Sequence, residues 1–267
     1  MINIELKDGS IKSIEKEMSV IEIAKEISEG LARMATCGRV DGKVVDLRTI
    51  IDKDCKLEIL TFDSDLEGKK AYWHTTSHIM AQAVSHLFPD TKFAIGPAIN
   101  DGGFYYDFDS TESFNDEDKA KIEEEMNKII KQNIPIEKFT LPKDKALELM
   151  KDQPYKVELI NDLKDGEEIS FYKQGDFTDL CAGPHLMTTG QVKCVKLLSN
   201  SGAYWRGDEH NKMLQRIYGI SFTKKSELED YLKMLEEAKE RDHRKIGKDL
   251  NLFMTHKLVG AGLPLYL

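Results

Sequence analysis

The chain has 267 residues, of which 40% are hydrophobic and 32% are charged, and its formal net charge is −9. A chain of this length can form about two domains with separate hydrophobic cores. It contains no apolar run of about 18 residues and no apolar segment near its first residue, so we expect neither a membrane span nor a secretory signal peptide. Its four cysteines show no paired spacing, which is typical of reduced thiols in a cytoplasmic protein.

The distribution of charge says more about binding partners than the net charge does. A net negative charge argues against a general nucleic-acid binder. Residues 109–129 contain eight acidic and three basic side chains, whereas residues 193–225 contain seven basic and two acidic ones. The second window is therefore the candidate surface for phosphate.

The first 60 residues predict a small domain of strands and one helix. The turn Asp8-Gly9 joins two segments of alternating apolar and polar residues into a β-hairpin. A helix is predicted to begin at Ser19, which forms a capping box with Glu22, and to end at Gly30. This order is that of the ubiquitin-like β-grasp fold, and it carries no catalytic group, so we expect an interaction module. The predicted strands are residues 2–6, residues 11–14, short segments around Val40 and Val44, and residues 56–60.

A helix bearing two histidines is the next predicted element. Residues 63–70 are polar and predict a linker, and the helix is expected from Tyr72 to Phe88, before Pro89. A spacing of four places His74 and His78 on the same face of this helix. The opposite face is apolar and should be packed, with Ile79, Met80, Ala83, Val84 and Leu87.

The region after this helix combines glycines with aromatic residues. The runs are Ile95-Gly96-Pro97 and residues 101–108. Glycines beside aromatics let a small substrate approach the backbone, although a tight hairpin with buried aromatics fits the pattern equally well. An acidic surface helix from Asp116 follows, and then a short helix between Pro142 and Pro154.

Residues 155–160 and 168–172 predict two strands, the second of which leads into Asp179-Leu180-Cys181. Lys156 lies in the first of them, where a lysine usually extends its amino group to the surface. If it were desolvated near the histidines, its pKa would fall and it could orient or deprotonate a water. Strands interrupted by helices without a βαβ repeat predict an α+β domain with a β-sheet and a long histidine-bearing helix.

The loop at residues 199–208 places Tyr204, Trp205 and Arg206 together within the basic window. Such a group can stack on bases or hold phosphate. The alternative is a buried Trp205 whose ring is covered by Arg206.

The last part of the chain predicts an amphipathic helix that begins at Ser226 with a capping box to Glu229. The helix leads into a basic run at residues 241–245. The remaining residues, up to Leu267, are too few for a domain, so we expect a fragment that ends as a third domain begins.

Four side chains from two segments carry the predicted chemistry. Cys181 and His185 are separated by Gly183 and Pro184, which constrain the backbone between them, and this segment could meet the two helical histidines. Histidines alone at this spacing are often incidental. With the second segment they make either a four-ligand metal site or a cluster of acid and base groups around a water.

Taken in order, these runs resemble the N-terminal half of a bacterial-type threonyl-tRNA synthetase, and the resemblance covers nearly the whole chain. Residues 8–10 and 42–47 resemble its small β-grasp (TGS) domain. Residues 211–219 resemble the stretch after its editing domain, and residues 241–247 resemble the start of its class II catalytic domain. The motifs that resemble the editing domain itself are His74-x-x-x-His78 and residues 95–97, 103–107, 155–157, 179–185 and 202–208.

The resemblance implies four parts. They are a TGS domain at residues 1–61, an editing domain of the threonyl and alanyl type at 62–225, a linker helix at 226–245 and a truncated start of the class II catalytic domain at 246–267. The full-length enzyme would ligate threonine to tRNA(Thr) with ATP, and it would be a cytoplasmic homodimer.

The resemblance also implies proofreading. A synthetic site for threonine cannot exclude serine, because a missing methyl group changes binding by only about 1–3 kcal/mol. A second site would hydrolyse the ester of serine on the acceptor end of tRNA(Thr). The glycine and aromatic runs at residues 96–106 would form a pocket too narrow for threonine.

Roles in this site follow from chemical type. His74 and Lys156 are expected to position or deprotonate the water, and His185 to stabilise developing charge or protonate the leaving oxygen. Asp179 suits the ammonium group of the substrate, and the other two residues orient the site. The expected catalytic residues are His74, His78, Lys156, Asp179, Cys181 and His185, and the expected substrate-binding residues are Gly96, Tyr106, Tyr172, Tyr204 and Arg206.

We expect no metal in this site. Zinc is the alternative, because the related alanyl-tRNA editing domains carry a similar set of ligands that binds it. The ATP and zinc of the threonyl family belong to its catalytic domain, beyond Leu267. The alternative zinc ligands are His74, His78, Cys181 and His185.

Two other functions compete with proofreading. The first is a zinc-dependent hydrolase of small esters or peptides, which the sequence disfavours because Thr75 follows His74 where such peptidases have glutamate. The second is a non-catalytic RNA-binding module in which residues 193–225 form the binding surface. In every case we expect no contact with a membrane.

Overall fold

The computed structural model describes all residues except 101, 165, 243–245, 248, 256–263 and 267. The chain divides into two compact units, Met1–Thr223 and Lys224–Leu267. Both units combine helices with sheets, which confirms the expected α+β class. None of the described helices is long and apolar enough to cross a membrane.

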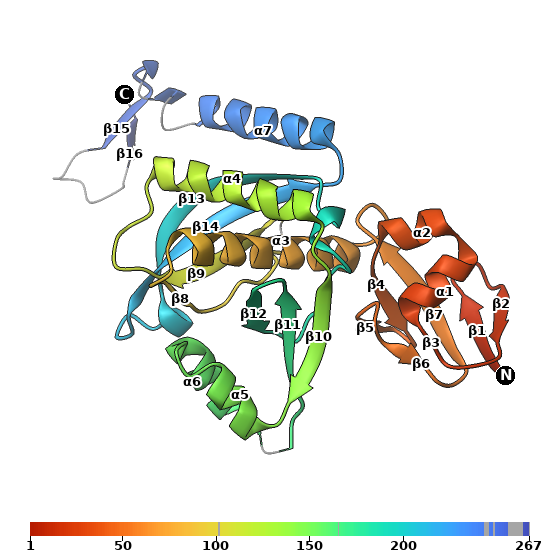
Figure 1. Ribbon diagram of the computed structural model, residues 1–267. Helices are drawn as coiled ribbons and strands as arrows, with labels where there is room; N and C mark the ends of the chain where they lie inside the picture. The colour runs from red at the N-terminus through yellow and green to blue at the C-terminus, as the bar shows by residue number, and fades with distance from the viewer. Residues whose placement is uncertain (101, 165, 243–245, 248, 256–263, 267) are drawn as a thin grey trace. The chain divides into compact units, whose positions relative to one another are not determined.

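The first domain is a five-stranded sheet packed against two short helices (Figure 1). The strand order is β2-β1-β7-β4-β5, in which β1 and β7 are parallel and the other pairs are antiparallel. Its elements are β1 (Ile2–Leu6), β2 (Ile11–Ile14), β3 (Met18–Ser19), α1 (Val20–Ile27), α2 (Glu29–Met34), β4 (Ala35–Val40), β5 (Lys43–Val45), β6 (Ile50–Ile51) and β7 (Cys55–Thr61).

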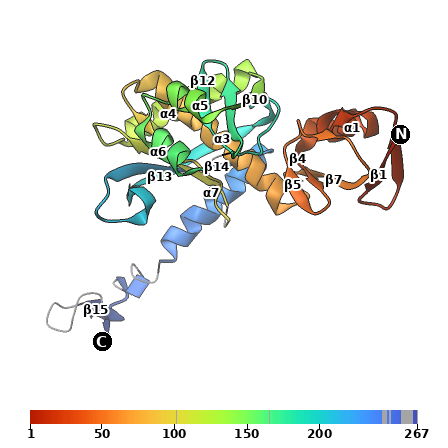
Figure 2. The same ribbon diagram turned by 90° about the horizontal axis from the view of Figure 1, so that it is seen from below.

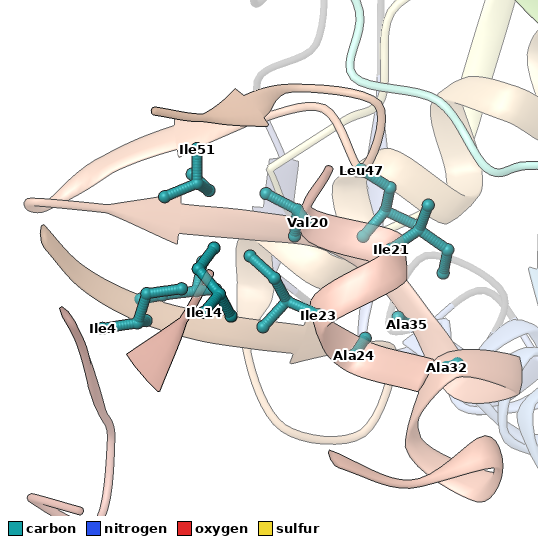
Figure 3. Close-up of a cluster of buried hydrophobic side chains, with 11 residues drawn as sticks. Ile4, Ile14, Val20, Ile21, Ile23, Ala24, Ala32, Ala35, Leu47 and Ile51 are labelled. Atoms are coloured by element: carbon teal, nitrogen blue, oxygen red, sulfur yellow. The ribbon is translucent and has the colours of Figure 1, made fainter. Parts of the chain in front are cut away.

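The core of this domain lies around α1, where Ile4, Val20 and Ile23 are fully buried (Figure 3). The predicted capping box is confirmed, because Ser19 and Glu22 bond each other's backbone N–H. The predicted helix end at Gly30 is wrong. Helix α1 ends at Ile27 because Ser28 leaves helical dihedrals and caps α2 with its own hydroxyl.

Helix α3 (Leu66–Leu87) connects the first domain to the second and runs through the centre of the second (Figures 1 and 2). It begins earlier than predicted, because the Asp65 carboxylate accepts a hydrogen bond from the Glu67 N–H. The predicted linker at 63–70 is therefore mostly helix. The predicted one-sided packing is also wrong, since α3 contacts α4, β9, β12 and β14 and its residues from Ala71 to Val84 are buried except His74.

Two further antiparallel sheets complete the second domain, with strand orders β13-β14-β9-β8 and β10-β11-β12. The predicted acidic helix from Asp116 is confirmed as α4, and its buried residues are Ile122, Met126, Ile129 and Ile130. The elements are β8 (Lys92–Phe93), β9 (Phe104–Asp109), α4 (Asp116–Gln132), β10 (Ile136–Leu141), α5 (Lys143–Leu149), α6 (Pro154–Asp162), β11 (Ile169–Gln174), β12 (Phe177–Leu180), β13 (Cys194–Tyr204) and β14 (Met213–Phe222), with short 3-10 helices η1 (Thr189–Gln191) and η2 (Trp205–Gly207).

The predicted strand at residues 155–160 is wrong, since these residues belong to helix α6. Pro154 does not end the preceding helix but occupies the first turn of α6. A proline is favourable there, because its missing N–H has no partner in the first turn and its φ is already helical. Two separate helices, α5 and α6, thus replace the expected helix and strand.

The second unit contains helix α7 (Lys225–Glu240) and the antiparallel pair β15 (Phe253–Thr255) and β16 (Pro264–Tyr266). The predicted capping box at Ser226 is wrong, because α7 begins one residue earlier without a side-chain cap. Within the predicted basic run, residues 243–245 lie outside the described part. Of the predicted start of a third domain at 246–267, residues 248, 256–263 and 267 also lie outside it.

Candidate active site

The predicted site residues of α3 and of the segment after β12 lie together. The imidazole centroids of His74 and His78 are 5.1 Å apart, and each is 4.3 Å from that of His185. The Cys181 thiol lies 3.3 Å from His74 Nε2 and 3.2 Å from His185 Nε2. We refer to these four residues as the His/Cys cluster.

The turn at Gly183 brings His185 back to α3. Gly183 has φ +78°, and a side chain there would place its Cβ 2.0 Å from Tyr172 Oη. Only glycine therefore allows the segment to pass the Tyr172 ring, whose centroid is 4.3 Å from that of His185. The Gly183 N–H donates to Cys181 Sγ at 3.3 Å, which fixes the thiol within the same turn.

A buried ion pair lies beside the His/Cys cluster. Lys156 Nζ is 2.5 Å from Asp179 Oδ1, and both side chains are 3% exposed. The Tyr106 hydroxyl donates to Asp179 Oδ2 at 2.6 Å, and Lys156 Nζ donates to the same hydroxyl at 3.2 Å. His78 Nε2 lies 3.7 Å from Asp179 Oδ2, so this carboxylate connects the pair to the cluster.

Burial keeps the cluster neutral. It lowers the pKa of His74 to about 3, with the nearby His78 acting in the same direction. It also lowers the pKa of His78 to about 4 and that of His185 to well below its ordinary value. The pKa of Cys181 is raised to about 12, mainly by burial and secondly by the negative charge of Asp179. Near pH 7 the site therefore holds three neutral imidazoles and a thiol.

The carboxylate of Asp179 stays charged despite its burial. Burial alone would raise its pKa, but the Lys156 ammonium and the neighbouring hydrogen bonds hold the pKa below its ordinary value. Burial, and then the charge of Asp179, raise the pKa of Tyr106 well above its ordinary range, so its hydroxyl remains a donor.

A cavity of about 300 Å³ opens onto one member of the cluster. Its lining includes His74, Pro97, Ala98, Gly183 and Pro184. Because the other imidazoles lie behind His74 and are buried, a molecule in this cavity meets His74 first. A larger cavity of about 910 Å³ lies elsewhere, and no residue of the cluster lines it.

The predicted pocket residues Gly96, Tyr106 and Tyr172 surround the cluster. A Cβ at Gly96 would lie 2.0 Å from Tyr106 Cδ2, so the glycine lets the Tyr106 ring pack against the backbone. Tyr172 is buried, and its hydroxyl donates to Asp46 Oδ2 at 2.8 Å. Gly96 and Tyr106 thus support the floor of the site rather than line the cavity.

The predicted residues Tyr204 and Arg206 lie apart from the cluster. Trp205 is buried against Tyr155, and the Arg206 guanidinium carbon lies 5.5 Å from the Trp205 ring centroid. The loop therefore has the alternative arrangement, a buried tryptophan whose ring is covered by the arginine. Arg206 also pairs with Glu158 and Asp162 of α6. Tyr204 remains 41% exposed.

Other cations of the basic window also have acidic partners. Lys196 pairs with Glu123, Lys212 with Asp109, and Arg216 with Asp107. Two of these acids belong to the acidic window at 109–129, so the charge contrast in the sequence is partly neutralised by tertiary contacts. An RNA-binding surface built on the window at 193–225 loses much of its electrostatic basis.

Sequence reasoning missed three residues that support the cluster, namely Thr75, Asp46 and Arg48. Thr75 Oγ1 lies 3.1 Å from His185 Nδ1 and accepts a hydrogen bond from the Leu186 N–H at 2.9 Å. The only sign of this role in the sequence is that Thr75 directly follows His74. Asp46 and Arg48 reach the site from the first domain, which no spacing in the sequence indicates.

Comparison with known families assigns the two domains of the unit Met1–Thr223. Residues 2–61 match the TGS domain, and residues 169–218 match the threonyl and alanyl tRNA synthetase second additional domain. The chain therefore carries a TGS domain followed by an editing domain of the threonyl and alanyl type.

The chain is also similar along its whole length to threonine–tRNA ligases. It is 62% identical over 265 residues to the enzyme of Clostridium perfringens (strain SM101), a match that covers 99% of this chain and 41% of the relative. The enzyme of Caldanaerobacter subterraneus subsp. tengcongensis is also 62% identical over 265 residues, with 98% of this chain and 41% of the relative covered. The chain thus spans about two fifths of the length of these curated relatives, and the resemblance to the N-terminal part of a bacterial-type threonyl-tRNA synthetase is confirmed.

Proposed function

We propose that this chain removes serine from mischarged tRNA(Thr) by hydrolysing the ester between the amino acid and the terminal ribose. The observation that carries the proposal is the convergence of the neutral His/Cys cluster and the buried Lys156–Asp179 pair beneath a cavity, in a domain of the editing type. A site of this kind can hold an uncharged ester and a water next to a fixed cation.

Serine is the proposed substrate because the synthetic reaction of the relatives cannot exclude it. Threonine–tRNA ligases must distinguish two hydroxyl amino acids that differ by one methyl group, which changes binding by only about 1–3 kcal/mol. A second site that admits serine and excludes threonine makes up the difference. Pro97, Ala98 and Pro184 give one part of the cavity wall rigid or small side chains, and Glu67 and Lys70 line another part.

His74 is proposed to position the attacking water, because it alone in the cluster lines the cavity. Its lowered pKa keeps the imidazole neutral at neutral pH, so one of its ring nitrogens carries a lone pair. An imidazole with a pKa of about 3 is a weak base, so orientation of the water is its main contribution. The proton of the water passes to solvent or to the leaving ribose oxygen during the reaction.

Lys156 is buried and does not line the cavity, so it is proposed to stabilise the negative charge that develops on the ester carbonyl oxygen through the field of its ammonium and not by direct contact. Its ammonium is fixed by Asp179 and Tyr106 before the substrate arrives, which is the preorganised arrangement that makes such donors effective. Both carboxylate oxygens of Asp179 already have partners. We therefore propose that Asp179 orients Lys156 rather than binding the substrate ammonium, the role expected from the sequence.

His185 is proposed to carry its proton on Nδ1, which leaves its Nε2 atom as a hydrogen-bond acceptor. Thr75 Oγ1 lies 2.9 Å from the Ala71 carbonyl, to which it donates its single proton, so the contact with His185 requires a proton on Nδ1. The Nε2 atom is then an acceptor that faces the Cys181 thiol. In this assignment Cys181 donates a weak hydrogen bond and orients the imidazole, and no covalent step at sulfur is needed.

We further propose that the site works without a metal. The four potential ligand atoms lie within 4.8 Å of one another, whereas the edges of a tetrahedral zinc site are about 3.3–3.7 Å, so the cluster would have to contract around the ion. A zinc ion there would also lie near the buried Lys156 ammonium, whose charge already opposes protonation of His74 and His78. If zinc were bound, His74, His78, Cys181 and His185 would hold it, and it would polarise a bound water.

Deacylation of seryl-tRNA(Thr) by the wild type, His74→Ala and His86→Ala tests the catalytic proposal. His86 is a matched control, because it lies on the same helix but bonds Glu125 and Asp176 away from the cluster. We expect His74→Ala to lower the rate about 100-fold and His86→Ala to change it by less than about threefold. Equal tRNA binding with no hydrolysis by any variant, wild type included, would support a non-catalytic RNA-binding module instead.

Elemental analysis of the purified protein tests the metal proposal. We expect less than about 0.1 equivalent of zinc and full deacylation after dialysis against a chelator. A stoichiometric zinc content, with activity lost on chelation and restored by zinc, would overturn it.

In a full-length protein like these relatives, we propose that this region serves an enzyme that charges tRNA(Thr) with threonine and ATP. The division at 1–61, 62–225, 226–245 and 246–267, the homodimer and the zinc of the catalytic domain belong to the same proposal. None of the four cysteines, all of which the structure describes, forms a disulfide, which supports a location in the cytoplasm.

A further inference from the structure

Two residues of the first domain reach the segment that carries His185. Asp46 and Arg48 follow strand β5, and they bond each other, since Arg48 N and Nη1 donate to Asp46 Oδ1 at 2.8 and 2.9 Å. The Asp46 side chain is 3% exposed and that of Arg48 17%. A buried carboxylate is retained only where charge-assisted bonds replace its water, so the partners of this pair indicate what it holds in place.

The partners of Asp46 and Arg48 are the backbone groups on either side of the His185 side chain. Asp46 Oδ2 accepts a hydrogen bond from the His185 N–H at 3.1 Å. Arg48 Nη1 donates to the His185 carbonyl at 3.3 Å, and Arg48 Nη2 donates to the Leu186 carbonyl at 2.8 Å. The backbone of His185 is therefore held on both sides by a domain 139 positions earlier in the sequence.

The same pair also fixes the ring that supports this segment. The Tyr172 hydroxyl donates to Asp46 Oδ2 at 2.8 Å, and Gly183 passes directly against that hydroxyl. Arg48 bonds the Ile136 carbonyl through Nε at 3.1 Å, which ties it to strand β10 next to β11. One ion pair thus joins the first domain to the floor of the site and to the turn that carries His185.

We propose that Asp46 and Arg48 are positioning residues of the editing site, through which the TGS domain sets the orientation of the His185 imidazole. This inference rests on the proposed function for its consequence in catalysis. Their hydrogen bonds to His185 go to its backbone N–H and carbonyl and not to its imidazole, so they act through the backbone of His185. A displacement of about 1 Å at a reacting group costs about 100-fold in rate, so loss of this anchor lowers the chemical step rather than tRNA binding.

The test compares Asp46→Asn and Arg48→Ala with Arg39→Ala in the whole chain. Arg39 is a matched control, because it belongs to the same domain, its side chain is 22% exposed, and it pairs with Asp65 at the start of α3 instead of with the His185 segment. Asp46→Asn keeps the size of the side chain but replaces one acceptor oxygen by a donor, so it cannot satisfy all four of its present donors. Circular dichroism and thermal unfolding establish that each variant is folded.

The first readout is single-turnover deacylation of seryl-tRNA(Thr), which separates the rate constant from tRNA affinity. We expect Arg48→Ala and Asp46→Asn to lower the rate constant about 10- to 100-fold, with affinity changed by less than about twofold. Arg39→Ala should stay within about threefold of the wild type. An equal loss in Arg39→Ala and Arg48→Ala would show that general docking of the domain matters, and would overturn the proposal.

The second readout is hydrogen exchange of the amides from Cys181 to Met187, which requires no activity. The His185 N–H should exchange at least about 10-fold faster in Asp46→Asn and be unchanged in Arg39→Ala. Unchanged exchange in Asp46→Asn would overturn the proposal. If the wild type does not deacylate the tRNA but the exchange difference is present, the proposed function fails and the positioning role stands.

Discussion

Helix α6 lies between two regions that the sequence marks as functional, and the structure treats them in opposite ways. On one side, Lys156 extends into the buried site and is held by Asp179 beside three neutral imidazoles. On the other side, Glu158 and Asp162 pair with Arg206 in the loop at residues 204–208, which we call the Trp205 loop.

The difference teaches that partners, and not residue types, decide which cation is available for chemistry. Lys156 and its carboxylate are nearly inaccessible to solvent, so their mutual attraction is weakly screened and their geometry is fixed. Arg206 is 41% exposed in its side chain and covers a tryptophan ring, so its charge is screened by water and already compensated. We therefore expect substitutions on the two sides of α6 to differ in kind.

The largest contrast should appear in deacylation rates. Lys156→Met removes the preorganised cation and should lower the rate constant for seryl-tRNA(Thr) about 10²- to 10³-fold. Arg206→Met should leave it within about threefold of the wild type. Single-turnover kinetics on both variants measures the contrast, and comparable losses in the two would contradict the assignment of the site to the Lys156 side.

A second contrast concerns two glycines. At Gly96 a Cβ would lie 2.0 Å from the Tyr106 ring, whereas at Gly207 in the Trp205 loop nothing lies within 4 Å and only the φ of +71° opposes a side chain. Gly96→Ala should therefore destabilise the fold by about 3 kcal/mol and Gly207→Ala by about 1 kcal/mol. Urea denaturation monitored by tryptophan fluorescence gives both values, and the reverse order would show that the Tyr106 ring can move aside.

Acid should destabilise the cluster before the rest of the fold. The folded pKa values of His74 and His78 are about 3 and about 4, below their ordinary value of 6.5, so protonation favours the unfolded chain. Their contribution to stability is complete above pH 6.5 and is lost as the pH falls toward 4. Protonation of each of these two histidines should lower the free energy of unfolding by about 2 kcal/mol between pH 7 and pH 5.

Unfolding free energies of the wild type and His74→Gln at these two pH values measure this loss. The variant should lose less stability on acidification, because it has one buried imidazole fewer. Parallel pH profiles for the two proteins would mean that His74 is protonated in the folded state.

The smallest effect is expected at the thiol. Cys181→Ser keeps a donor toward His185, and we expect a loss of deacylation of less than about tenfold, because the thiol orients and does not attack. Complete inactivation, or a covalent seryl adduct trapped on Cys181, would contradict this role. The control is Cys194→Ser, since Cys194 donates to the Phe222 carbonyl outside the cluster.

The sequence was sufficient for the elements that depend on local patterns. The spacing of His74 and His78 predicted a shared helical face, and the capping box at Ser19 predicted the start of α1. Residues 155–159 alternate apolar and polar side chains, as a strand does, and so short a segment does not distinguish that period from a helical one. Only Pro154, in the first turn of α6, indicates a helix.

Features that depend on contacts between distant segments could not be predicted. Asp46 and Arg48 bond the backbone of His185, and a backbone group leaves no signature in the side-chain pattern. The compensation of Arg206 by α6, and of Lys196 by Glu123 in α4, likewise depends on how the sheet and helices pack. A count of charges in a window therefore overestimates the charge that the folded surface presents.

The most direct test of the account is the hydrolysis of seryl-tRNA(Thr) and threonyl-tRNA(Thr) by the same preparation of this chain. We predict that the seryl ester is hydrolysed at least about 10-fold faster, because the proposed site must admit serine and exclude threonine, which carries one more methyl group. Equal rates for the two esters, or no hydrolysis of either above the spontaneous rate, would contradict the central claim.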